Sequence, residues 1–237
     1  MSSVPDFDAP LRSLVAQAAE FAEQSPEAAA AGQWWYQQPP GLPPQAARAP
    51  ATMRQASVLV LLWEEDDGAR LLLTERSTAL AKHPGQISFP GGAAEAGDAD
   101  PAGTALRETH EELGLDPARV EVLGPLPPAP VPSGFSVVPV LAVAEDLGVL
   151  TPDPGEVARV IKAPVADLLN SQHRYSAVIE REGIRLRSPA FFFGEGTADA
   201  AFVWGFTGLL LDRMLHRLGW AREWDESREL DPRRFKR

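Results

Sequence analysis

The sequence predicts a mixed α/β fold, of the α+β or α/β/α sandwich type with a mixed sheet, preceded by an N-terminal extension. Three observations support this prediction. Several short apolar runs have strand character from residue 56 onward, one well-capped helix interrupts them near residues 101–113, and the first fifty residues differ in pattern from the rest. Strands on both sides of a single helix, in mixed order, favour a sheet covered by helices.

The composition is that of a globular protein, and it limits the function classes. The chain has 237 residues, of which 44% are hydrophobic and 23% are charged, which suits one domain with extensions or at most two small domains. A net charge of −11 argues against a role in wrapping a nucleic-acid backbone, which needs a basic surface. The absence of cysteine excludes disulfides, thiolate metal sites and a cysteine nucleophile.

The sequence also lacks membrane and export signals. No apolar stretch approaches the ~20 residues of a membrane span. The chain begins at Met1 without the basic and apolar regions of a signal peptide. We therefore expect a cytoplasmic protein with no membrane or nucleic-acid partner.

Residues 1–50 form the predicted extension, and residues 51–237 form the predicted main domain. Apolar residues at helical spacing predict a short amphipathic helix over residues 11–22. The segment that follows is rich in proline, which blocks helices and interior strands. We expect it to be a connector that packs back on the domain through Trp34 and Trp35. A PxxP ligand for a partner protein is the less favoured alternative.

The predicted strands include two hairpins. Residues 57–63 and 70–76 are joined by a short acidic loop with a glycine, and residues 175–180 and 184–187 flank a second such turn. A last helix is predicted at residues 206–218, where apolar residues share one face. Further strands are predicted at residues 86–89, 120–123, 137–143 and 156–162.

The central helix carries its own boundary signals. Asp100 is a good N-cap, Pro101 fits the first helical position and Gly114 is placed to end the helix. Its predicted inward face consists of Ala102, Ala105, Leu106, Thr109 and Leu113.

Three carboxylates on this helix, Glu108, Glu111 and Glu112, stand at i, i+3 and i+4 and project from adjacent turns of one face. Like charges at these spacings repel each other and slightly destabilise a helix. Two interpretations fit them. One is a solvated acidic face paired with Arg107, and the other is a site for a hard cation such as Mg²⁺, which takes oxygen ligands. His110 lies between them and is expected to face solvent.

The segment before the helix favours the cation site. Residues 88–92 (Ser-Phe-Pro-Gly-Gly) end a strand in a loop whose glycines allow close backbone approach. Such a loop can present a carbonyl to a metal or N–H groups to a phosphate.

Residues 92–115 resemble the Nudix box. That motif is a glycine, five residues, Glu, seven residues and then Arg-Glu-hydrophobic-x-Glu-Glu-x-Gly-hydrophobic. Its second half matches at every position but one, where Thr109 replaces a hydrophobic residue. In the first half the acid is Asp98 rather than Glu, and eight residues instead of seven separate it from Arg107. The resemblance implies a Nudix α/β/α sandwich.

The stretch upstream of the box is similar to the signature of coenzyme A pyrophosphatases. Residues 72–92 read LLTERSTALAKHPGQISFPGG. In that family an arginine commonly follows the leucine occupied here by Leu80, and this chain has Ala81, with Lys82 next to it. Residues 152–157 and 203–207 resemble two further segments of the same family, Asn-Pro-x-Glu-Val and Ile-Trp-Gly-x-Thr.

The resemblance implies that water hydrolyses a pyrophosphate linkage, with Mg²⁺ or Mn²⁺ as cofactor. It implies metal ligation by Glu108 and Glu112 first, by Glu111 next and by the carbonyl of Gly92. Arg107 is expected to orient a helix carboxylate rather than to contact substrate.

A general base and substrate contacts complete the expected site. Either Glu111 or Glu156 could take a proton from water, although Glu156 fits an ordinary strand-edge acid equally well. The negative net charge requires local cations to hold an anionic substrate, and Arg76 and Lys82 are the candidates, together with the N–H of Gly91. For the nearby His83, simple packing is favoured over a substrate role.

Three functions remain open. The first is hydrolysis of coenzyme A or acyl-CoA to adenosine 3′,5′-bisphosphate and 4′-phosphopantetheine species. The second is the same chemistry on another nucleoside diphosphate derivative, such as ADP-ribose or a dinucleotide, which the alanine at position 81 keeps open. The third is a non-catalytic binding module, which three retained glutamates argue against. A homodimer is compatible with the sequence.

Overall fold

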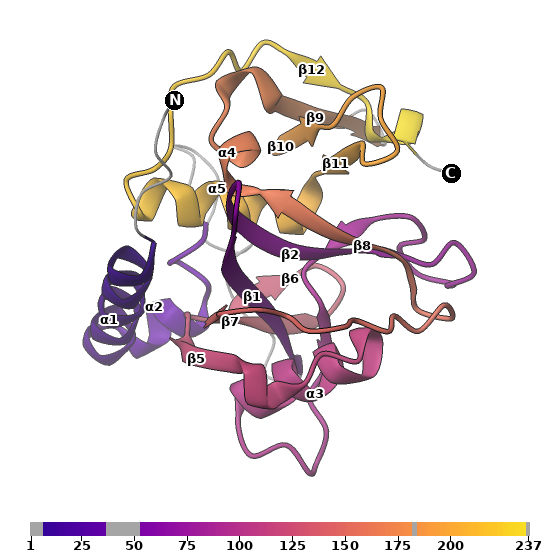
Figure 1. Ribbon diagram of the computed structural model, residues 1–237. Coiled ribbons are helices and arrows are strands. Elements are labelled where there is room, and N and C mark those ends of the chain that lie inside the picture. The colour runs from indigo at the N-terminus through magenta and orange to yellow at the C-terminus, as the bar shows by residue number, and fades with distance from the viewer. Residues whose placement is uncertain (1–6, 37–52, 182–183, 236–237) are drawn as a thin grey trace. The chain divides into compact units, whose positions relative to one another are not determined.

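The computed structural model describes residues 7–36, 53–181 and 184–235, and it divides into two compact units (Figure 1). Of the described residues, unit 1 contains those within 62–89 and 150–235, and unit 2 those within 7–61 and 90–149, so strand β1 (Arg54–Glu65) runs through both. None of the helices in the described ranges is long and apolar enough to cross a membrane. The expected boundary at residue 50 and the proline-rich connector after Tyr36 lie outside the described residues.

Unit 2 combines three helices with paired strands. Strand β1 pairs with β4 and β7, and β7 pairs in turn with β5 and β6. Helices α1 and α2 lie side by side next to β5, and α3 packs against β4, β5 and β7 (Figure 1). The elements are α1 (Asp8–Gln24), α2 (Pro26–Ala30), β4 (Gly91–Ala93), α3 (Pro101–Leu113), a 3₁₀ turn (Pro117–Arg119), β5 (Val120–Pro125), β6 (Ala129–Val131) and β7 (Phe135–Ala144).

The N-terminal helices belong to the core of unit 2. Leu11 of α1 and Trp35 are both fully buried. The indole Nε1 of Trp35 donates a 2.6 Å hydrogen bond to the carbonyl of Pro127, and the Tyr36 hydroxyl donates one of 2.6 Å to the carbonyl of Pro130. Burial raises the pKa of Tyr36 to about 12. The expectation that this segment packs back on the domain through its tryptophans is confirmed.

Unit 1 contains two groups of strands. In the first, β2 pairs with the end of β1, with β3 and with β8, and the second is a four-stranded sheet in the order β11-β10-β9-β12. Helix α5 packs against β10, and α4 contacts β2, β8 and β10. The elements are β2 (Gly68–Arg76), β3 (Ile87–Ser88), β8 (Val157–Pro164), α4 (Val165–Leu168), a 3₁₀ turn (Ser171–His173), β9 (Arg174–Arg181), β10 (Ile184–Phe193), β11 (Ala201–Val203), α5 (Gly205–Arg217), β12 (Glu229–Leu230) and a 3₁₀ turn (Pro232–Phe235).

The mixed α/β class and both hairpins are confirmed by these pairings. The structure differs from the prediction at Gly91–Ala93, which forms strand β4 on β1 instead of a loop. On α3, Ala102 and Leu106 are only half-buried, whereas Thr104 is buried in their place. Strands β6 and β12 were not predicted, because segments of three and two residues are too short to show a periodic hydrophobic pattern.

Candidate active site

Helix α3 is fixed at both ends as its sequence predicts. The Asp100 carboxylate accepts a 2.8 Å hydrogen bond from the N–H of Gly103, and Pro101 occupies the first turn. At the other end Gly114 adopts the left-handed conformation with φ of 66°, and its N–H bonds to the carbonyl of His110 at 2.7 Å. The acidic residues of the helix are therefore held in a defined rotation and register.

Strand β4 brings backbone directly against these acids. Gly91 and Gly92 pair with Val58 and Ser57 of β1. A Cβ on Gly91 would lie 2.3 Å from the carbonyl oxygen of Ser57, and a Cβ on Gly92 would lie 2.3 Å from a carboxylate oxygen of Glu108. Because a side chain at either position would occupy space already filled, both glycines are needed for this close approach.

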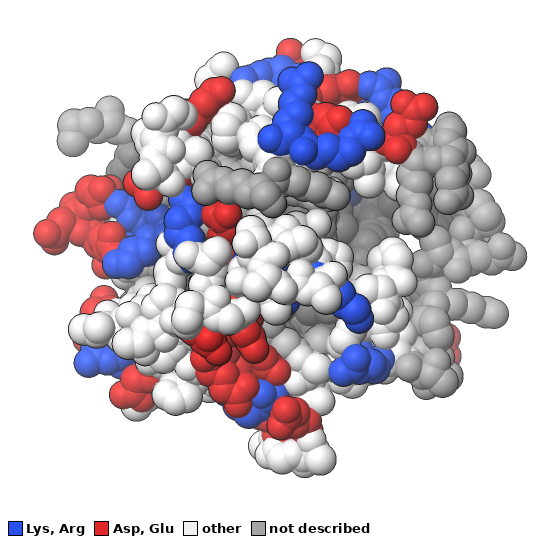
Figure 2. Space-filling view, turned by 90° about the vertical axis from the view of Figure 1, so that its right-hand side faces the viewer, with Lys and Arg blue, Asp and Glu red and all other residues white. Residues whose placement is uncertain are grey.

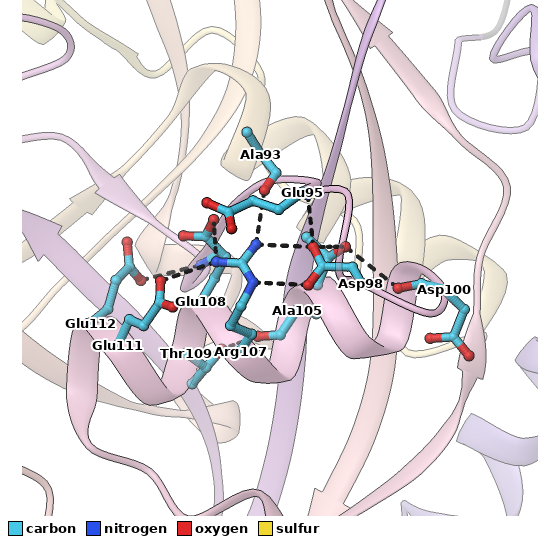
Figure 3. A network of polar contacts seen from close by, with 12 residues as sticks. Ala93, Glu95, Asp98, Asp100, Ala105, Arg107, Glu108, Thr109, Glu111 and Glu112 are labelled. Carbon is cyan, nitrogen blue, oxygen red and sulfur yellow. Dashed lines mark hydrogen bonds and ion pairs between the residues drawn. The ribbon is translucent and has the colours of Figure 1, made fainter.

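The guanidinium of Arg107 is the centre of the polar network in Figure 3. It donates from Nε and Nη2 to the two oxygens of Asp98, at 2.8 and 3.0 Å. Nη1 donates to Glu108 at 3.1 Å and to Glu111 at 3.0 Å, and Nη2 also reaches the carbonyl of Ala93 at 3.0 Å. Arg107 thus connects two glutamates of α3 with Asp98, which precedes the helix, and with Ala93 at the end of β4.

Asp98 is the main partner of Arg107, and the sequence prediction left it out of the site. Its Oδ2 also accepts the N–H of Glu95 at 2.8 Å and the hydroxyl of Thr104 at 2.9 Å. These hydrogen bonds, that from Arg107 first, hold the pKa of Asp98 well below its usual range, and the bond to Asp98 raises the pKa of Arg107. The sequence signal that could have identified Asp98 is its place in the Nudix box, where it stands for the upstream glutamate with one extra residue before Arg107.

The three glutamates occupy different environments. The side chain of Glu111 is 57% exposed and that of Glu108 is 17% exposed, whereas Glu112 as a whole residue is only 4% exposed. An oxygen of Glu112 accepts the N–H of Gly91 at 3.2 Å. Figure 2 shows acidic side chains gathered in one patch at the level of α3. A buried glutamate that faces the glycine strand disagrees with the interpretation of a merely solvated acidic face.

The residues of this cluster fit a hard divalent cation by their chemistry. Three carboxylates, those of Asp98, Glu108 and Glu111, pair with one guanidinium, and the fourth, Glu112, accepts the N–H of Gly91. These carboxylates and the Gly92 carbonyl offer only oxygen ligands, and only a glycine leaves room beside Glu108. Within the described ranges, however, no three His, Asp or Glu side chains are arranged around a common metal position. Arg107 donates to one oxygen each of Glu108 and Glu111, so the guanidinium orients these carboxylates.

The other predicted residues lie in unit 1. Arg76, the last residue of β2, pairs with Val157, and the carbonyl of Glu156 accepts the N–H of Ser77 at 2.7 Å, so Arg76 and Glu156 share one end of the β2–β8 pair. Lys82 is exposed in the loop between β2 and β3 and forms no ion pair with any described residue. Arg107, Gly91, Gly92 and the three helix glutamates come together in unit 2.

Two histidines complete the comparison with the sequence. His110 is exposed, as expected, with Nδ1 3.0 Å from the carbonyl oxygen of Leu115. The packing expectation for His83 is wrong. His83 is exposed, has a left-handed backbone with φ of 56°, and places Nδ1 2.9 Å from Oε1 of Gln86.

Comparison with known proteins supports the motif. The family model described as the NUDIX domain matches residues 53–181. Nudix hydrolase 15, mitochondrial, of Arabidopsis thaliana is 39% identical over 164 residues, which are 68% of this chain and 57% of the relative. The uncharacterized Nudix hydrolase NudL of Enterobacter sp. (strain 638) is 36% identical over 173 residues, which are 70% of this chain and 83% of the relative. NudL of Escherichia coli (strain K12) is 35% identical over 172 residues, with the same shares of both chains.

The match to the plant relatives covers little more than half of their length, 57% of Nudix hydrolase 15 and 54% of Nudix hydrolase 22, chloroplastic. The resemblance to coenzyme A pyrophosphatases stays a prediction. The match of the domain model over residues 53–181, together with identities of 35 to 39% to these relatives, shows that the chain belongs to the Nudix hydrolase family.

Proposed function

We propose that the protein is a metal-dependent pyrophosphohydrolase that cleaves a nucleoside diphosphate derivative, with coenzyme A or acyl-CoA as the substrate. The products would be adenosine 3′,5′-bisphosphate and 4′-phosphopantetheine species. The observation that supports this most directly is the carboxylate cluster around Arg107, set against the glycine backbone of β4. A cytoplasmic location, a homodimer and a catalytic domain over residues 51–237 belong to the same proposal.

The helix carboxylates are proposed to hold the cation. Nudix hydrolases generally use divalent metal ions, and Mg²⁺ or Mn²⁺ fits an all-oxygen donor set. Glu108 and Glu112 would be ligands, with Glu111 and the carbonyl of Gly92 beside them. When bound, the cation supplies neutralisation of phosphate charge and a lowered pKa of bound water. Arg107 supports this role, because its hydrogen bonds hold the carboxylates of Glu108 and Glu111 in place.

The general base must be able to reach a water molecule. Glu111 is the favoured candidate in unit 2, because its side chain is the most exposed of the three glutamates. The Glu111 carboxylate accepts a 3.0 Å hydrogen bond from Arg107, which orients one of its oxygens. Glu156, which is exposed and directly precedes β8, is the alternative base in unit 1.

Support for coenzyme A comes from residues 72–92, which resemble the coenzyme A pyrophosphatase signature. Arg76 and Lys82 are the cations of this stretch, and Lys82 has no competing carboxylate partner among the described residues. We propose that Lys82 contacts the 3′-phosphate of coenzyme A, in the neighbourhood where the family commonly has an arginine and this chain has Ala81.

A substrate screen tests the proposal. Coenzyme A, ADP-ribose, NADH and nucleoside triphosphates are incubated with Mg²⁺ or Mn²⁺, and the products are separated by chromatography. Coenzyme A should be cleaved at its pyrophosphate with the highest kcat/KM. Better turnover of ADP-ribose would replace coenzyme A by the second substrate class, and no turnover of any compound would favour a non-catalytic module.

The role of Lys82 is tested with 3′-dephospho-coenzyme A. Loss of one charge-assisted contact should lower kcat/KM tens- to a hundredfold relative to coenzyme A. Lys82→Ala should shrink this preference and leave turnover of the dephospho compound nearly unchanged. Equal kcat/KM for both compounds in the wild-type protein would remove the 3′-phosphate contact from the proposal.

A further inference from the structure

Unit 1 contains a pocket that the proposed chemistry does not use. Its volume is about 280 Å³, close to the lower end of small-molecule sites. One side is formed by the loop residues Pro84, Gly85 and Gln86, and the other by β10, β11 and the C-terminal 3₁₀ turn. All its lining residues belong to the described part of unit 1.

Aromatic rings form a preassembled wall of this pocket. Phe202 and Phe235 stack with centroids 4.3 Å apart and an angle of 26°, and Phe192 meets both rings edge-on at 6.1 and 5.1 Å. Trp204 lines the same pocket and packs against this cluster. Because the rings already hold one another, a flat ligand can pack on them with little loss of side-chain freedom.

A buried carboxylate lines the pocket beside the rings. Glu75 is 8% exposed, and its Oε2 accepts both hydrogen bonds from Arg159, from Nε at 3.0 Å and from Nη2 at 2.9 Å. Arg159 also donates from Nη1 to the carbonyl of Ala198 and from Nη2 to the carbonyl of Ala200, each at 2.9 Å. Since both bonds go to Oε2, the other oxygen of Glu75 retains its acceptor capacity for a ligand.

A second cation, Arg234, lines the pocket. It is exposed and has no ion pair with a described side chain. Its neighbour Arg233 is held by Asp231 at 2.7 Å and is not part of the lining. The pocket therefore combines an aromatic wall, a buried acceptor and an exposed guanidinium available to an anion.

This combination selects among ligand classes. An aliphatic chain would bury against the ionised Glu75–Arg159 pair without satisfying it. An organic cation would suit the rings and Glu75 but would be repelled by two arginines. A purine nucleotide with an exocyclic amine would satisfy all three features: the ring would pack on the phenylalanines, the amine would donate to Glu75 and the phosphate would pair with Arg234.

We propose that this pocket binds an amino-purine nucleotide, with the base amine on Glu75 and the phosphate on Arg234. The choice of a nucleotide rests on the proposed function, whose substrates carry one. The nucleotide can be the nucleoside part of the substrate or a separate free nucleotide, and both have the same chemistry.

Saturation-transfer NMR with AMP as the probe tests the pocket without turnover. The full chain is studied in EDTA, so that binding does not depend on the metal site. AMP should receive saturation mainly at its base protons. Purine riboside 5′-monophosphate, which lacks the amine, should bind at least about tenfold more weakly, and ribose 5-phosphate should not bind detectably. Equal binding of AMP and ribose 5-phosphate, or no binding at millimolar AMP, would overturn the proposal.

Two adjacent arginines give a matched pair of variants. Arg234→Ala should weaken AMP binding about tenfold, whereas Arg233→Ala should leave it unchanged, because Arg233 bonds to Asp231 outside the lining. Phe235→Ala should weaken binding of AMP and of the purine control alike, because it removes ring contact from both. Equal effects of the two arginine variants would contradict the placement of the phosphate.

Steady-state kinetics separate the two sources of the nucleotide. If the pocket holds the substrate's own nucleoside, Arg234→Ala raises KM, leaves kcat unchanged, and AMP inhibits competitively. If a free nucleotide occupies it, KM is unchanged and AMP alters kcat. AMP binding in EDTA without hydrolysis of any pyrophosphate compound would refute the proposed function but support the nucleotide pocket. Hydrolysis without AMP binding would support the proposed function but refute the nucleotide pocket.

Discussion

Gly92→Ala separates the function of the carboxylate cluster from the stability of the fold. The added Cβ would lie 2.3, 2.5 and 2.7 Å from the three carboxyl atoms of Glu108, where ordinary contact begins at 3.4 Å. The carboxylate must therefore retreat by about 1 Å, which also breaks its 3.1 Å hydrogen bond with Arg107. A displacement of this size at a reacting centre costs on the order of a hundredfold in rate.

The fold should tolerate the same change. Gly92 does not require a positive φ, and the atoms in the way belong to the end of a flexible side chain. We therefore expect kcat/KM to fall about a hundredfold and Mn²⁺ affinity, measured by calorimetry, to fall with it, while Tm changes by no more than a few degrees.

Gly97→Ala is the matched control, because a Cβ there meets nothing within 4 Å in the same segment before α3. It should leave kcat/KM and Mn²⁺ affinity unchanged. A Gly92→Ala protein with wild-type kcat/KM and wild-type Mn²⁺ affinity would show that the position of Glu108 does not matter for catalysis, and the placement of the cation beside Gly92 would be wrong.

Four further predictions concern the metal, the other acids of the site and the N-terminal segment. Glu112→Gln keeps the shape of the side chain but removes its charge, so turnover should fall at least about a hundredfold with little change in Tm in a thermal melt. EDTA should abolish turnover reversibly without unfolding the protein, as circular dichroism would show. The pKa of Asp98 is lower in the folded than in the unfolded protein. The ionised Asp98 therefore stabilises the fold fully above about pH 5, and this contribution to the free energy of unfolding is lost as the pH falls through the lowered pKa. Asp98→Asn, which also releases Arg107, should therefore lose less stability than the wild type between pH 6 and pH 2.5 in urea titrations. Trp35→Phe removes the indole hydrogen bond to Pro127 and should cost about 1–3 kcal/mol, or roughly 2–10 °C in Tm.

The helices and hairpins could be predicted because their signals are local. Asp100, Pro101 and Gly114 define α3 without reference to any other part of the chain, and the structure places all three as expected. The pairing of Gly91–Ala93 with β1 could not be predicted, because glycine is depleted in strands and the reason for its presence lies in the Ser57 carbonyl, distant in sequence.

The sequence predicts which residue types form the site, but it does not predict how deeply each side chain is buried. Spacing places Glu108, Glu111 and Glu112 on one side of the helix, but it does not reveal that only Glu112 is buried. The burial of Glu112 depends on its contact with Gly91 of β4, and this tertiary contact cannot be seen from the spacing within the helix. Asp98 was passed over for a related reason, since its importance comes from its hydrogen bonds to Arg107 and not from its distance to the motif.

The burial of Trp35 has a consequence during synthesis of the chain on the ribosome. Its hydrogen-bond partner Pro127 lies 92 residues further along, and the partner of Tyr36 lies 94 residues further along. At about 5–20 residues per second, these partners are translated roughly 5–20 s after the aromatic residues. During this interval the apolar face of α1, with Leu11 and Leu14, has no strand of β5 or β7 to cover it. We therefore expect the nascent N-terminus to expose an apolar helix face during this interval, and slow codons before residue 127 should lengthen the exposure and lower the soluble yield.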